Sequence, residues 1–155
     1  MKGNSMSHDD TVDTLNDLIE TSKDGEFGFT ACAKHVTSAD LQQLFTTRAA
    51  DCRAAASELQ TMVSDYGGKP ENDGTASGAL HRGWVAVRGS LAGYSDEAML
   101  EECERGEDAA LARYRAALRD EALPEAVRAV VARQQLGVQA NHDQIKRLRD
   151  IARAA

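Results

Sequence analysis

Two glutamates interrupt an otherwise apolar helical face in the C-terminal half of the chain. The face repeats at steps of four and three residues, which places its members on the side of a helix that a bundle buries. Its members are Leu100, Glu104, Glu107, Leu111, Tyr114 and Leu118. Carboxylates are rarely buried unless they are paired or bind a metal ion. The two glutamates therefore predict either a metal site or a set of partners that neutralises them.

A histidine on the next predicted helix can lie opposite these glutamates. Because a tight turn falls near residue 123, antiparallel packing sets residue 104 level with about residue 142, and 107 level with about 139. Carboxylate oxygens and imidazole suit iron, manganese or zinc, so Glu104, Glu107 and His142 are candidate ligands. The alternative is a structural role with polar partners across the bundle, drawn from Gln134, Asn141, His142 or an arginine. We expect an arginine or an amide.

The N-terminal half offers two further candidate ligands, Glu26 and Glu58. Gly25-Glu26 and Gly106-Glu107 look like halves of a repeat, and the same offset carries Gln139-x-x-His142 onto Glu58-x-x-Thr61.

Height along the bundle contradicts this repeat. With the first turn near residue 36 or 37, Glu26 is level with Arg48, while Glu58 is level with Leu15, about 16 Å away at 1.5 Å per residue. Glu26 and Arg48 are both central on their apolar faces. We therefore expect these two residues to form a buried ion pair.

Four long amphipathic helices must position these residues. The apolar periodicity, the N-cap residues and the glycine and proline positions together set their expected limits. The helices are expected from Asp10 or Thr11 to about His35, from Thr37 or Ser38 to about Tyr66, from Ser95 to about Glu121, and from about Glu125 to Arg153.

The spacing between the helices predicts their topology. The turns at 35–38 and 122–124 are tight, whereas about 28 residues separate the second helix from the third, as in bundles with a long crossover connection. The expected fold is an all-α ferritin-like four-helix bundle with a crossover helix over 79–91 that contains Trp84. A flexible tail is expected over 1–10 and the bundle over 11–155. The alternative is a three-helix core with a mobile middle segment.

Composition excludes several classes of partner. The chain has 155 residues and a formal net charge of −7, with acidic and basic residues interspersed, whereas nucleic acid requires a basic surface. No stretch approaches the ~20 apolar residues that span a bilayer. We expect a cytoplasmic protein with no nucleic-acid or membrane partner, and a homo-oligomer stays open. Cys32, Cys52 and Cys103 are odd in number and far apart, so we expect reduced, buried and inert thiols.

Several stretches of the chain carry a resemblance to a known family. They are 15–20, 24–25, 28–29, 79–84 and 101–110. Together they resemble a bacterial family of ferritin-like proteins of unknown function, over nearly the whole chain after residue 10. The resemblance implies a ferritin-like bundle, often associated with bacterial stress responses, with no established reaction. The chain departs from the superfamily's Glu-x-x-His motif at Thr61 and Gln139.

The sequence contains no nucleophile motif and no phosphate-binding glycine loop. It favours a non-catalytic bundle protein with a structural or interaction role. The resemblance implies that this role is related to stress. The alternative is a metalloprotein with a reduced carboxylate and histidine site that binds iron, manganese or zinc.

Overall fold

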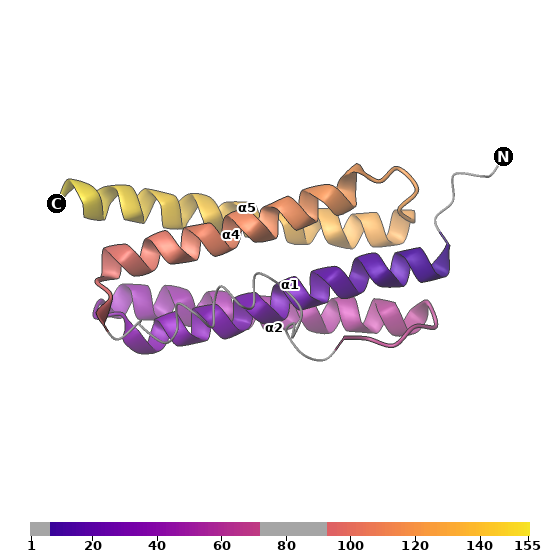
Figure 1. The fold of residues 1–155 in the computed structure, drawn as a ribbon, viewed down its shortest axis with the longest axis horizontal. Coiled ribbons are helices and arrows are strands. Elements are labelled where there is room, and N and C mark those ends of the chain that lie inside the picture. The colour runs from indigo at the N-terminus through magenta and orange to yellow at the C-terminus, as the bar shows by residue number, and fades with distance from the viewer. Residues whose placement is uncertain (1–6, 72–92) are drawn as a thin grey trace.

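The computed structural model describes residues 7–71 and 93–155, which form four long helices and, within these ranges, no strand (Figure 1). Helix α1 spans His8–His35, α2 Ala39–Asp65, α4 Asp96–Arg119 and α5 Glu125–Ala154. The predicted all-α four-helix bundle is confirmed. Helix α1 begins slightly earlier than expected. The predicted crossover helix over 79–91, with Trp84, lies outside the described residues.

The four helices form two antiparallel hairpins, α1–α2 and α4–α5, stacked on each other (Figure 1). Helix α1 packs against both α2 and α4, and α5 packs against α4, so α2 and α4 face each other across the diagonal of the bundle. Helix α2 ends at the end of the bundle opposite to that where α4 begins (Figure 1).

Serine residues start three of the helices. The side chains of Ser7, Ser38 and Ser95 accept hydrogen bonds from backbone N–H groups three residues further on, which satisfies donors that a helix start leaves free. The N-caps predicted at Ser38 and Ser95 are confirmed. Helix α2 is followed by Tyr66 and then by Gly67, whose φ of 78° is a left-handed conformation that glycine adopts without strain.

Two apolar clusters fill the interior, one toward each end of the bundle. The Tyr114 cluster consists of Leu15, Leu18, Ile19, Leu59, Val63, Ala110, Leu111, Tyr114, Ala117, Leu123, Val127, Val131 and Val138. The Phe29 cluster consists of Phe29, Cys32, Ala33, Leu41, Phe45, Ala49, Cys52, Met99, Leu100, Cys103 and Ile145. Buried polar side chains, among them Ser22, Arg48, Glu107 and Gln134, lie between the two clusters. The middle of the bundle is therefore a polar layer.

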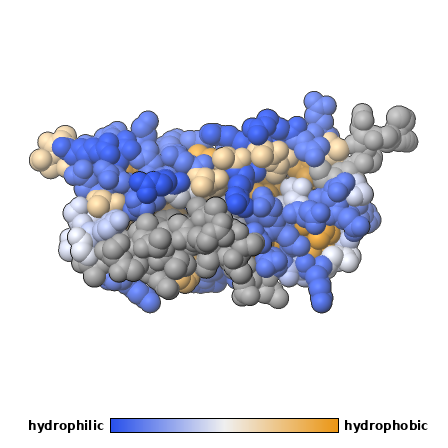
Figure 2. All heavy atoms as spheres, viewed as in Figure 1, coloured by the Kyte–Doolittle hydropathy of each residue, from blue (hydrophilic) through white to orange (hydrophobic). Residues whose placement is uncertain are grey.

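The outer surface is mostly hydrophilic on the face shown in Figure 2. None of the described helices is long and apolar enough to cross a membrane.

Asp96, the first residue of α4, ties that helix to the joint between α1 and α2. Its carboxylate accepts hydrogen bonds from the backbone N–H of Thr37 at 2.8 Å, from the Thr37 hydroxyl at 2.9 Å and from the backbone N–H of Ser38 at 3.0 Å. Partial burial acts to raise the pKa of Asp96, but these hydrogen bonds outweigh it and hold the pKa below its usual value.

We expect Asp96→Ala to lower the free energy of unfolding by about 1–2 kcal/mol, because two backbone N–H groups and a hydroxyl lose their acceptor. Since the folded pKa is depressed, this contribution is complete above the unfolded pKa and is lost as pH falls through the folded pKa. Urea unfolding at neutral pH and at about pH 2 measures the difference.

Glu97→Ala is the matched control, because Glu97 is the next residue and makes only a 3.7 Å surface contact with Arg153. Its cost should be within about 0.5 kcal/mol. A difference between wild type and Asp96→Ala that stays constant down to the lowest pH would contradict the assignment.

Candidate functional site

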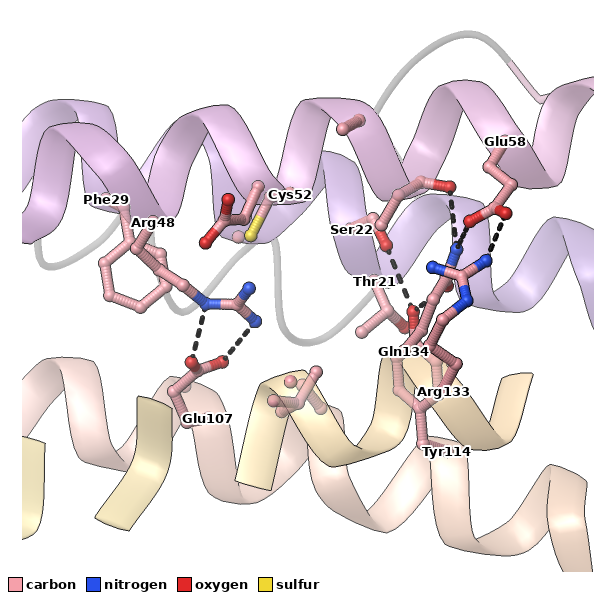
Figure 3. Close-up of a pocket in the computed structure, with 18 residues that line it drawn as sticks. Thr21, Ser22, Phe29, Arg48, Cys52, Glu58, Glu107, Tyr114, Arg133 and Gln134 are labelled. Carbon is pink, nitrogen blue, oxygen red and sulfur yellow. Dashed lines mark hydrogen bonds and ion pairs between the residues drawn. The ribbon is translucent and has the colours of Figure 1, made fainter. Parts of the chain in front are cut away.

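The most buried ion pair in the described chain joins the two hairpins through the centre of the bundle. Arg48 of α2 and Glu107 of α4 point toward each other (Figure 3). Arg48 Nε lies 2.9 Å from Glu107 Oε2 and Nη2 lies 3.3 Å from Oε1, with side-chain exposures of 9% and 3%. Because α2 and α4 are diagonal to each other, the pair crosses the interior rather than a helix seam.

Further contacts complete the surroundings of this pair. Asn141 of α5 donates a hydrogen bond to Glu107 Oε2, and the Arg48 guanidinium lies 5.8 Å from the centre of the Phe29 ring. Burial acts to lower the pKa of Arg48, but the neighbouring Cys52 and Glu107 outweigh it and raise that pKa above its usual value. The expected arginine and amide partners of the buried carboxylate are confirmed.

The predicted ion pair between Glu26 and Arg48 is wrong. Glu26 instead binds Arg53, whose Nε lies 2.8 Å from Glu26 Oε2 at the half-exposed edge of the α1–α2 hairpin. The long Arg48 side chain reaches across the bundle to Glu107 of the other hairpin, whose carboxylate is 3% exposed against 24% for Glu26. The more deeply buried carboxylate has the greater need of a cation.

A second polar group lies in the same layer, toward the Tyr114 cluster, and extends from the interior to the surface. The Tyr114 hydroxyl donates to Gln134 Oε1 at 2.7 Å and lies 3.5 Å from the Ser22 hydroxyl. Gln134 in turn donates to Glu58 Oε1 at 2.8 Å, and Arg133 binds the other oxygen of Glu58. Burial raises the pKa of Tyr114 to about 12, so its hydroxyl is neutral at physiological pH.

A cavity of about 300 Å³ lies between these two polar groups (Figure 3). All four helices contribute to its wall, which includes the glycines Gly25, Gly106 and Gly137. A Cβ added at Gly137 would meet no atom within 4 Å. Cys52 also lines it, and burial raises the pKa of this thiol to about 12. No buried side-chain nitrogen or oxygen in the described part of the chain lacks a hydrogen-bond partner.

The interior donors do not fit the di-iron arrangement of ferritin-like proteins. Such a site takes a glutamate from each of two helices and a Glu-x-x-His pair from each of the other two. Here Glu107 is bound to Arg48, Glu58 to Arg133 and Gln134, and Glu26 to Arg53. The residues that line the cavity include no histidine.

Glu104 and His142 meet outside this interior layer, at the seam between α4 and α5. His142 Nε2 lies 3.8 Å from Glu104 Oε2 and 2.6 Å from Asp108 Oδ1. These three residues are the one group in the described chain whose ligand atoms could hold a metal ion, all within 4.8 Å of one another. The predicted common level of residues 104 and 142 is confirmed.

The observed group differs from the predicted ligand set: it includes Asp108 and excludes three of the predicted glutamates. Asp108 was missed, although it follows Glu104 by four residues and so lies on the same side of α4. Glu107, Glu58 and Glu26 lie apart from the group, and Gln139 bonds Arg115 and Asp143 at the surface. Arg149 forms an ion pair with Glu104, so a metal ion at this seam would have to compete with a guanidinium.

Solved structures show the same fold at low sequence identity. A thioferritin, the bacterioferritin-related protein from Bacteroides fragilis, matches with a TM-score of 0.79 and 17% identity, over 99% of this chain and 92% of that chain. A mutant of Dps1 from Mycobacterium smegmatis matches with a TM-score of 0.71 and 14% identity, over 90% of this chain and 94% of the other. At this identity the similarity establishes the ferritin-like fold alone.

The sequence comparisons place the chain in a family. No curated protein matches it. One family model matches residues 10–120, which is most of the chain. The matched range includes all of α2 and α4, and α1 from residue 10 onward. The chain belongs to that family, which is described as domain of unknown function (DUF2383).

Proposed function

We propose that this protein is a non-catalytic ferritin-like bundle of the bacterial cytoplasm, with a structural or protein-interaction role in stress responses. The observation that carries the proposal is the ion pair between Arg48 and Glu107, which is 9% and 3% exposed. An interior glutamate that already has an arginine and an asparagine as partners has no need of a metal ion to neutralise it.

The charge of Arg48 also acts against metal binding in the interior. A guanidinium is permanently charged and donates hydrogen bonds in fixed directions. The Arg48 guanidinium therefore binds both Glu107 oxygens, the atoms that a metal ion would need as ligands. A divalent cation that approached Glu107 would meet this positive charge a few ångströms away. The polar layer therefore serves to fix the two hairpins in one arrangement.

Self-association is part of the proposed role. The thioferritin with the same fold is described as dodecameric. In the described chain the two large apolar side chains that remain exposed are Leu136 at 67% and Ile151 at 60%, and both lie on α5. We propose that α5 contributes to contacts between copies of this chain.

A second candidate function is the binding of a single divalent ion at the seam between α4 and α5. Glu104, Asp108 and His142 supply two carboxylates and an imidazole, a donor set that suits zinc, manganese or iron(II). Asp143 Oδ1 lies 3.1 Å from His142 Nδ1, which orients the ring so that Nε2 faces the two carboxylates.

The first test is a double-mutant cycle on the central ion pair. Arg48→Met should lower the free energy of unfolding by about 3–5 kcal/mol, because it leaves the Glu107 charge buried and unpaired, and Glu107→Leu should cost a similar amount. The double variant should recover most of that loss. Chemical denaturation with circular dichroism measures all three.

Arg53→Met is the matched control for this cycle, because Arg53 lies on the same helix and forms an ion pair that is largely exposed. Its cost should stay below about 1 kcal/mol. If the double variant loses the sum of the two single losses in unfolding free energy, the pair has no structural coupling and the proposal is wrong.

The absence of catalysis is tested by aerobic addition of iron(II) to the purified protein. We expect iron oxidation no faster than in buffer. An acceleration that Glu107→Gln abolishes and that Glu97→Gln leaves unchanged would overturn the non-catalytic proposal.

The self-association proposal predicts a light-scattering mass above that of one chain. Leu136→Asp with Ile151→Asp should reduce this mass, because each introduces a charge where an apolar contact forms. The circular dichroism spectrum of the double variant should remain that of a folded helical bundle, since both side chains are exposed in the single chain. A wild-type mass of a single chain contradicts the proposal.

The metal candidate is tested by metal analysis and by thermal unfolding with and without a chelator, on protein purified without a histidine tag. A bound ion at 100 times its dissociation constant stabilises the fold by about 2.7 kcal/mol, so chelation should lower the melting temperature. His142→Ala should remove the effect. His35→Ala should retain it, because the His35 ring bonds Ala31 of its own helix. Equal melting temperatures with and without chelator in wild type would reject this candidate.

A further inference from the structure

Two of the three cysteines come from different hairpins and meet inside the Phe29 cluster. Cys32 lies on α1 and Cys103 on α4, 71 residues apart in the chain. The Cys103 thiol donates a hydrogen bond to Cys32 Sγ, with 3.7 Å between the two sulfurs. Both residues have no exposed surface. The sequence spacing indicated isolated, inert thiols, but the packing of α1 against α4 makes them neighbours.

We propose that Cys32 and Cys103 form a modification site, at which a small hydroperoxide such as hydrogen peroxide oxidises the two thiols to a disulfide that locks the hairpins together. A disulfide needs its sulfurs about 2.05 Å apart, so they must approach each other by about 1.7 Å. Side-chain rotation and a small shift between two packed helices can supply this movement. The proposal is independent of the function proposed above.

The reaction consumes one hydroperoxide for each disulfide. The first thiol, as its thiolate, attacks a peroxide oxygen, the O–O bond breaks, and a sulfenic acid and one water or alcohol result. The second thiol then attacks the sulfenic sulfur, the S–O bond breaks, and the hydroxyl leaves with the thiol proton as water. The two sulfurs together lose two electrons, and the peroxide gains them. Whichever sulfur attacks first, the product is the same.

The surroundings make this reaction slow. Burial and the hydrogen bond to Cys32 raise the pKa of the Cys103 thiol well above its usual value, so little of it is thiolate at physiological pH. Neither thiol reaches solvent in the closed bundle. The pair therefore reacts stoichiometrically under sustained exposure to peroxide and does not turn over as a peroxidase would.

The disulfide would join the hairpins close to the central ion pair. Cys103 and Glu107 are one helical turn apart on α4, and their partners Cys32 and Arg48 come from the other hairpin. A bond across a loop of this length restricts the unfolded chain strongly, so the oxidised protein should melt at a higher temperature.

Cys52 provides an internal control in the same cluster. It is also buried, but its Sγ lies against Gly25, where an added Cβ would be only 2.9 Å away. In the structure its thiol faces the backbone of α1 and the central cavity rather than another sulfur.

The test exposes the folded, full-length protein to hydrogen peroxide, denatures it and alkylates the free thiols. We expect an intact mass with one alkylated cysteine, and peptide mapping that finds Cys32 linked to Cys103 and Cys52 alkylated. The melting temperature should rise by about 10 °C and return to its original value with a reductant. Cys103→Ser and Cys32→Ser should lose the rise, and Cys52→Ser should keep it.

Three results would overturn the proposal. These are three alkylated cysteines after peroxide treatment, a disulfide that includes Cys52, and a linkage between two chains on a non-reducing gel. A mapped Cys32–Cys103 bond without any rise in melting temperature would reject the lock. The mapping uses the wild-type protein, so a variant that fails to fold does not affect the decision.

Discussion

A carboxylate that is 3% exposed requires a positive charge or several hydrogen bonds. Glu107 obtains both, from Arg48 of α2 and Asn141 of α5, only in one arrangement of the helices. Arg48 reaches it across the diagonal of the bundle. A slip of α4 by one turn, about 5.4 Å, would separate the two groups and leave two charges buried without partners. Leucine and valine side chains on their own tolerate such shifts better, because apolar contacts have no fixed direction. The ion pair therefore selects the register that the apolar clusters then stabilise.

The polar layer borders a part of the interior that side chains do not fill. The Tyr114 and Phe29 clusters contribute most of the burial, while glycines and alanines border the space between them. A side chain at Gly25 would crowd Cys52, because an added Cβ would lie 2.9 Å from its Sγ, whereas one at Gly137 would meet no atom within 4 Å. The unfilled space is the cavity of about 300 Å³ between the Arg48–Glu107 pair and the Tyr114–Gln134 pair.

Much of the fold was predictable because its signals are local. Apolar periodicity, the serines at positions 38 and 95 and the glycines after Tyr66 mark helices from residues close together in sequence. Heights within one hairpin follow from the position of its turn, which is why Glu104 and His142 lie together. The rotation and register between hairpins depend on packing of the whole interior. That packing sets the partner of Arg48 and the contact of Cys32 with Cys103, neither of which any local pattern indicates.

The different surroundings of neighbouring residues on α4 follow from helix geometry. Each step along the helix turns the side chain by about 100°, so side chains within two turns can face all three neighbouring helices. Cys103 meets Cys32 of α1, Glu104 meets Arg149 of α5, and Glu107 meets Arg48 of α2. Asp108 returns to α5 and His142. One short segment thus contacts all three other helices through a thiol pair, a seam of carboxylates and imidazole, and a central ion pair. Because these contacts differ in chemistry, a substitution at each of the four positions removes a different kind of interaction, although the residues are neighbours in sequence.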